Sequence, residues 1–189
     1  MIQAINSLGC FLLLILTTGS ACAGTSPEQL AAESEAYVKS TARETPTEPA
    51  TIVAKVDDAC TLLSKEGPAA FPRFKGKDSP FLFEGTYIWI HSLPETKMLM
   101  HPIKYKMEGN ELAGLKDERG KRFFATMNTV VNASGQGWVD YFWPVPGTKD
   151  IARKISYVKK CVMANGVDVV IGCGMYNGDP AAIERLDIK

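Results

Sequence analysis

Alternating hydrophobic and polar positions in the C-terminal half of the chain predict three consecutive β-strands. Glycine, proline and asparagine residues separate them, as is typical of turns. The three segments are residues 135–146, 156–159 and 169–176. Because side chains alternate between the two faces of a strand, Tyr141 and Trp143 share one face and Trp138 lies on the other. One face of this sheet is therefore expected to pack a core, while the other lines a site.

The N-terminal half shows the spacing of three and four residues that is typical of helices. One apolar stripe predicts a long helix from Ala50, which ends at Gly67. The stripe consists of Ile52, Val56, Cys60 and Leu63. Ahead of it, Ser26 and Pro27 begin a separate polar helix, and Pro46 breaks this segment.

The middle of the chain predicts a hairpin, an irregular segment and a further helix. Residues 86–91 alternate and lead through a turn to residues 97–101. Residues 104–120 contain three glycines and predict no regular element, whereas residues 121–131 have a helical pattern. This order of elements predicts an α+β fold with a single antiparallel sheet.

Residues 1–23 are predicted to be a signal peptide. The apolar run Cys10–Leu16 is too short to span a bilayer, and the small residues that follow fit cleavage after Ala23. The weaker alternative is a lipoprotein signal at Cys22, which lacks the usual leucine three residues ahead. No other segment approaches the roughly 20 apolar residues of a membrane helix. We therefore expect a periplasmic or secreted protein with no membrane span in the mature chain.

The remainder has the size of one domain. We expect a polar helix and linker at 24–48, a single domain at 49–177 and a C-terminal tail at 178–189. The chain carries 21 Lys and Arg residues and 21 Asp and Glu residues, which are interspersed. Such a surface offers no electrostatic footprint for nucleic acid.

Cleavage of the signal peptide would leave Cys60, Cys161 and Cys173 in a compartment that permits disulfides. Cys161 and Cys173 fall on neighbouring antiparallel strands, so they are the favoured pair. Cys60 is expected to pack as a small hydrophobic residue. The pairing among the three nevertheless stays open at this point.

Several spaced motifs resemble the single Cache domain of bacterial extracytoplasmic sensors, from about Ile52 to Tyr176. They are Met100-His-Pro102, Glu108-Gly-Asn110, Leu115-Lys-Asp117, Gly120-Lys-Arg-Phe123, Gly137-Trp-Val-Asp-Tyr141, Trp143-Pro144, Ser156-Tyr-Val-Lys159 and Gly172-Cys-Gly-Met-Tyr176. The resemblance implies a PAS-like fold, in which a long N-terminal helix packs behind a five- to six-stranded antiparallel sheet and a pocket lies on the other face. Relatives in chemoreceptors and histidine kinases sense small molecules, and short-chain carboxylates are the ligands implied. Only Asn177–Lys189 follow, so we expect a free-standing exported version.

Aromatic and cationic side chains of the C-terminal strands form the candidate site. Tyr141 and Trp143 share one strand face, and Tyr157 and Lys159 share a face of the next strand. If both faces belong to the pocket, Lys159 would neutralise a carboxylate and the tyrosines would donate hydrogen bonds. The alternative for these aromatic residues is ordinary core packing.

Arg153 and Lys154 are rival anion ligands. Arg153 is preferred over Lys154 because it has the same strand parity as Tyr157, and the choice between Arg153 and Lys159 stays open. The resemblance places His101 near the pocket mouth. Trp138 could stack on a ligand, although its parity favours packing against a helix unless a bulge resets the alternation.

The sequence contains no pattern of catalytic residues, and we expect neither a cofactor nor a metal site. The leading hypothesis is an exported sensor-type module that binds a small organic acid in signal transduction or chemotaxis. The alternative is a non-catalytic periplasmic interaction protein that docks to a membrane receptor. A homodimer is a further possible partner.

Overall fold

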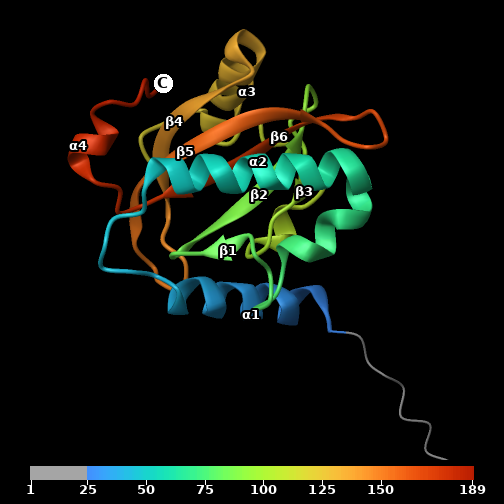
Figure 1. The fold of residues 1–189 in the computed structure, drawn as a ribbon, viewed down its shortest axis with the longest axis horizontal. Coiled ribbons are helices and arrows are strands. Elements are labelled where there is room, and N and C mark those ends of the chain that lie inside the picture. Colours follow the sequence, from blue (N-terminus) through green and yellow to red (C-terminus); the bar gives the residue numbers. More distant parts are fainter. Residues whose placement is uncertain (1–24) are drawn as a thin grey trace, which may run out of the picture.

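A computed structural model of the protein describes residues 25–189, so the predicted signal peptide lies outside the described residues. Figure 1 shows one sheet with a long helix across its near face and a second helix beneath it. The helices are α1 (Pro27–Ser40), α2 (Pro49–Glu66), α3 (Phe123–Ser134) and α4 (Pro180–Ile183), with the short 3₁₀ segments η1 (Gly67–Phe74) and η2 (Tyr105–Met107). Within this part of the chain, no helix is both long and apolar enough to cross a membrane.

Six antiparallel strands form the sheet, in agreement with the predicted α+β fold. The strands are β1 (Leu82–Phe83), β2 (Thr86–Ser92), β3 (Met98–Met100), β4 (Gln136–Pro144), β5 (Ile151–Val162) and β6 (Asp168–Met175). Their order is β1-β2-β6-β5-β4, and β3 pairs with β2 off this path. The predicted hairpin and the three C-terminal strands are therefore confirmed.

The predicted helices also form where the sequence patterns place them. Ser26 caps α1 through a capping box with Gln29, and α2 begins with Pro49 and ends at Gly67, where φ is 60°. The stripe that α2 buries is Ile52, Val56, Ala59 and Leu63. Cys60 was expected in this stripe, but it is only half-buried.

The two faces of the sheet bury separate hydrophobic cores. The face that α2 covers, nearest the viewer in Figure 1, is called the back face here, and the face that α3 covers is called the front face. The core of the back face joins α2 to side chains such as Ile88, Tyr157 and Ile171. The front core joins α3 and part of α1 to side chains that include Tyr87 and Tyr141. Helices on opposite faces therefore protect both sides of the sheet from water.

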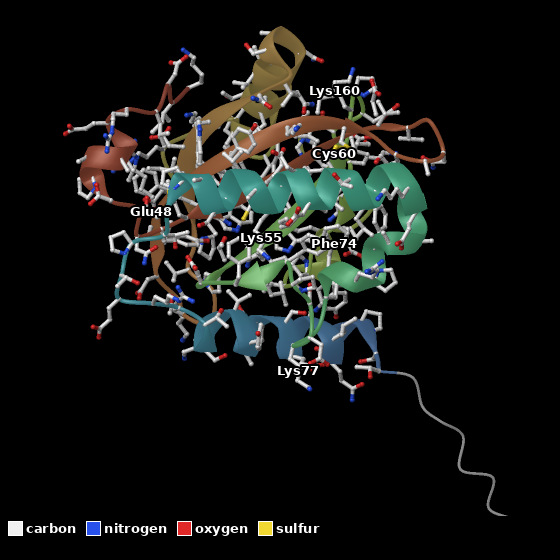
Figure 2. All side chains as sticks on the ribbon, viewed as in Figure 1. Glu48, Lys55, Cys60, Phe74, Lys77 and Lys160 are labelled. Atoms are coloured by element: carbon white, nitrogen blue, oxygen red, sulfur yellow. A yellow bond between two sulfur atoms is a disulfide. The ribbon has the colours of Figure 1, made fainter. Side chains whose placement is uncertain are left out.

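The predicted disulfide is wrong, because Cys161 pairs with Cys60 and not with Cys173. The hairpin register places Cys161 opposite Val169 and Cys173 opposite Tyr157, too far apart along the strands for a bond. Cys161 instead faces α2, where the Cα atoms of the bonded pair are 5.8 Å apart. Figure 2 labels Cys60 on α2. Cys173 is a free, buried thiol.

Replacing Cys60 and Cys161 together by alanine should lower the free energy of unfolding by about 2 to 5 kcal/mol, because the bond closes a long loop in the unfolded chain. Urea denaturation measures this loss. Cys173→Ala is the matched control and should keep the bond. Detection of a Cys161–Cys173 peptide after non-reducing digestion would contradict the assigned pairing.

Candidate functional site

The front face of the sheet carries a lysine among aromatic rings. Tyr141 on β4 lies directly opposite Lys154 on β5, and both point away from α2. Lys154 is fully buried, and its Nζ has no hydrogen-bond partner among residues 25–189. A buried ammonium without a partner is costly, so this position calls for a functional explanation.

Three aromatic rings surround the ammonium of Lys154. The distances from Nζ to the ring centroids are 3.9 Å for Tyr87, 5.1 Å for Trp89 and 5.2 Å for Tyr176. Such cation–π contacts offset part of the cost of burial. Burial nevertheless lowers the pKa of Lys154 from its ordinary value of 10.5 to about 7, while the thiol of Cys173 raises it and the positive charge of Lys104 lowers it further.

Hydrogen bonds hold the surrounding rings in place. Trp143 Nε1 donates to the hydroxyl oxygen of Tyr87 at 3.0 Å, and the hydroxyls of Tyr141 and Ser156 lie 3.2 Å apart. Tyr141 also stacks on Phe123, with ring centroids 4.3 Å apart. Burial raises the pKa of both Tyr87 and Tyr141, so the two phenols stay protonated and can donate hydrogen bonds.

His101 lies against this group of rings, 5.0 Å from Tyr87 between centroids. Its Nδ1 accepts the backbone N–H groups of Ile103 and Lys104, at 3.3 and 2.9 Å. The ring is therefore neutral, with its proton on Nε2. Burial holds the pKa of His101 well below its usual range, and the positive charges of Lys154 and Lys104 add to this effect. The structure thus brings His101 together with Tyr141 and Trp143.

Two glycines of β6 leave room for the lysine and one ring. A Cβ atom on Gly172 would collide with the indole of Trp89, and one on Gly174 would lie 2.9 Å from Cε of Lys154. Side chains at these two positions would therefore fill the space that the site occupies. Trp89 Nε1 is a second buried donor without a partner in the described part of the chain.

The expected convergence of Tyr157 and Lys159 with Tyr141 is wrong. Tyr157 lies on the back face opposite Trp138, with ring centroids 5.3 Å apart, and both belong to the core under α2. Lys159 Nζ donates to Asp57 on α2 at 2.6 Å. An anion ligand role for Lys159 on the front face is therefore ruled out by its direction.

Arg153 also points to the back face. It forms an ion pair with Asp140 on β4, at 2.8 Å. Arg153 was expected to be the anion ligand in preference to Lys154 because it shares strand parity with Tyr157. The register of β4 and β5 pairs odd-numbered residues with even-numbered ones, so this parity argument selected the wrong face.

Sequence reasoning missed Tyr87, Trp89, Ser156 and Tyr176, and it named Lys154 as an anion ligand only to prefer Arg153. The alternation of residues 86–91 places Tyr87 and Trp89 on one face and was a usable signal. Gly172 and Gly174, two residues apart on one strand, were a second usable signal, because glycines in a strand indicate that bulky side chains pack closely against it.

The comparisons agree with this fold. The chain belongs to the family described as single Cache domain 2, whose model matches residues 72–182. The family expected from the sequence motifs is thereby confirmed. The chain is also 32% identical over 96 residues to the methyl-accepting chemotaxis protein McpP of Pseudomonas putida. This match covers 51% of the chain but only 17% of McpP, so the chain spans a small part of that relative's length.

Solved structures of sensor domains are similar to the chain. A periplasmic sensor domain of a chemotaxis protein is 31% identical, with a TM-score of 0.54, and the match covers 67% of this chain and 93% of that domain. A Cache chemosensory domain, described in terms of carboxylic acid recognition, is 25% identical with a TM-score of 0.50 and coverages of 77% and 92%. A methyl-accepting chemotaxis protein from Vibrio parahaemolyticus, 22% identical with a TM-score of 0.54 and coverages of 67% and 84%, supports the fold alone.

Replacing Lys154 by methionine should change how stability depends on pH. Between pH 7 and pH 10.5 the folded wild type lacks a proton that the unfolded chain retains, so its free energy of unfolding rises with pH in this window. The variant lacks this rise and should be more stable than the wild type below pH 7, by an amount on the order of a few kcal/mol. Urea denaturation at pH 6, 8 and 9.5 measures the difference, and parallel curves for the two proteins would contradict a buried, titrating Lys154.

Proposed function

We propose that the protein is an extracytoplasmic, non-catalytic sensor module that binds a short-chain carboxylate on the front face of its sheet. The observation that carries this proposal is the unpartnered ammonium of Lys154 in a cage of aromatic rings. A ligand carboxylate would neutralise this charge, and the surrounding rings would strengthen the attraction by excluding water.

The donors around Lys154 suit a small acid. The indole N–H of Trp89 is buried without a partner, and Nε2 of His101 carries its proton on the same face. Each hydrogen bond to an ionised carboxylate contributes roughly 1.5 to 3 kcal/mol. The description of one similar Cache domain in terms of carboxylic acid recognition supports the same ligand class.

Isothermal titration with acetate, propionate, pyruvate and lactate tests the proposal, in protein shown by native mass spectrometry to be free of ligand. At least one acid should bind to the wild type. Lys154→Met should weaken its binding by about 10- to 100-fold, because the charge-assisted bond is lost. Lys159→Met, on the back face, is the matched control and should bind as the wild type does. Loss of binding in the Lys159 variant alone would overturn the assignment.

Binding should also depend on pH. Above pH 7 the free protein has lost the proton of Lys154, whereas a bound carboxylate favours the charged ammonium. Binding therefore takes up a proton, and the dissociation constant should rise by up to tenfold per pH unit above 7. Titrations at pH 8.5 in buffers with different ionisation enthalpies measure the proton uptake. Equal heats in all buffers would argue against Lys154 as the anion ligand.

A further inference from the structure

The N-terminal helix α1 is held to the domain mainly by polar contacts. Of its 14 residues only Ala31, Ser34 and Val38 are buried. An isolated helix of this length is marginal in water, so α1 depends on its contacts for its position. It also precedes residues 72–182, which the family model matches. Figure 1 shows α1 running beneath β1, away from α2.

Glycines from three separate loops donate their backbone N–H groups to side chains at α1. The acceptors lie along the helix and at its C-terminal cap. The bonds join Gly76 to Ser34 Oγ (2.8 Å), Gly147 to Glu35 Oε1 (3.1 Å) and Gly85 to Thr41 Oγ1 (3.3 Å). Lys77, which follows the first of these glycines, is labelled beside α1 in Figure 2. The three loops thus hold α1 along its length.

The close approach of α1 depends on the missing side chains of these glycines. A Cβ on Gly85 would lie 3.1 Å from Cα of Ala42, and one on Gly147 would lie 2.6 Å from Cδ of Lys39. Both glycines also have a positive φ, of 75° and 70°. The loops therefore fit α1 specifically, although each contact is a single hydrogen bond.

The linker that follows α1 borders a hollow that is also lined by Tyr176, a neighbour of Lys154. This cavity of about 150 Å³ is lined by Thr86, Val145 and Tyr176 of the domain and by Ala42 and Arg43 of the linker. The ring of Tyr176 is 5.2 Å from Lys154 Nζ. Tyr176 therefore lies both at this hollow and beside the buried ammonium.

Polar contacts also fix the linker itself. Arg43 forms an ion pair with Glu84 at 3.0 Å, and Asn177 Nδ2 donates to the carbonyl oxygens of Arg43 and Thr45. The Arg43 side chain is 63% exposed, so this ion pair contributes little stability. Contacts of this kind can break locally without unfolding the domain.

Lys154 is out of reach of solvent in this structure. Its side chain is fully buried, and Val38 of α1 belongs to the same core as Tyr87, the ring closest to Lys154. A ligand can therefore reach the ammonium only if some covering segment moves. A covalent bond, the Cys60–Cys161 disulfide, fixes α2 to the back face of the sheet. Among the described residues no disulfide holds α1, which is attached through hydrogen bonds such as that from Gly76 to Ser34.

We propose that α1 and its linker form a lid over the ligand site, which is released from the three glycine loops to admit the ligand and closes again over it. The lid comprises residues 27–47, and it moves as one body about the start of α2 at Pro49. This inference rests on the proposed function for the identity of the ligand, but the opening of the lid can be measured without any ligand.

Hydrogen exchange of the protein without ligand tests the opening. Backbone amides of α1 and of the three glycine loops should exchange together, and at least tenfold faster than the core amides of α2. The double variant Ser34→Ala, Glu35→Ala should accelerate the exchange of all the amides of α1 and the glycine loops by about tenfold or more. It removes the hydrogen bonds from Gly76 and Gly147 that hold α1 to the domain. Glu33→Ala is the matched control, because Glu33 is a carboxylate of α1 with no hydrogen-bond partner among residues 25–189. It should leave exchange unchanged.

Stopped-flow tryptophan fluorescence with propionate tests the gating, because Trp89 and Trp143 lie at the site. The double variant should raise the association rate constant several-fold, and the control should not. Exchange in α1 as slow as in α2, or an association rate unchanged in the double variant, would overturn the lid. If the wild type binds none of the tested acids, the carboxylate proposal fails, and hydrogen exchange alone then decides whether α1 opens as a unit.

Discussion

The register between β4 and β5 is the constraint on which the rest of the structure depends. It places Lys154 opposite Tyr141 on the front face, and Trp138 opposite Tyr157 on the back. A shift by one residue would exchange the two faces. Arg153 would then point into the front core, and the two glycines of β6 would no longer lie beneath the bulky side chains. The chemistry of the site therefore follows from the pairing of two strands.

Among the lysines and arginines of the strands, Lys154 alone has no carboxylate partner in the described part of the chain. On the back face each strand cation has a carboxylate partner, as in Lys159 with Asp57 and Arg153 with Asp140. On the front face Lys154 has rings as neighbours and no carboxylate within hydrogen-bond distance among residues 25–189. Exposed ion pairs such as these contribute little stability, whereas an unpaired buried charge costs stability. A residue such as Lys154, which lowers the stability of the fold, indicates that its position serves a purpose other than folding.

Much of the fold was predictable from the sequence, because it follows from local patterns. The apolar stripe of α2, the cap at Ser26 and the alternation in β4 each predicted an element that the structure confirms. The site was predicted only in part. His101, Tyr141 and Trp143 share the front face, whereas Tyr157 and Lys159 do not. The error came from the turn between β4 and β5, because its length decides which residues pair and no pattern within a strand reveals it. The disulfide was missed for a related reason, since the meeting of α2 with β5 depends on tertiary packing.

The difference between the faces also decides which part of the molecule can respond to a ligand. Movement of α2 would require breaking a disulfide as well as the Lys159–Asp57 ion pair and the packing of four buried apolar residues. Release of α1 requires breaking the hydrogen bonds to Ser34, Glu35 and Thr41, of which the bond to Ser34 is buried, and exposing Val38 and Ala31. Since local opening takes the path of lowest free energy, α1 and its linker are the segments in which the proposed response to a ligand at Lys154 would begin. The rigid back face then serves as the fixed frame against which that movement occurs.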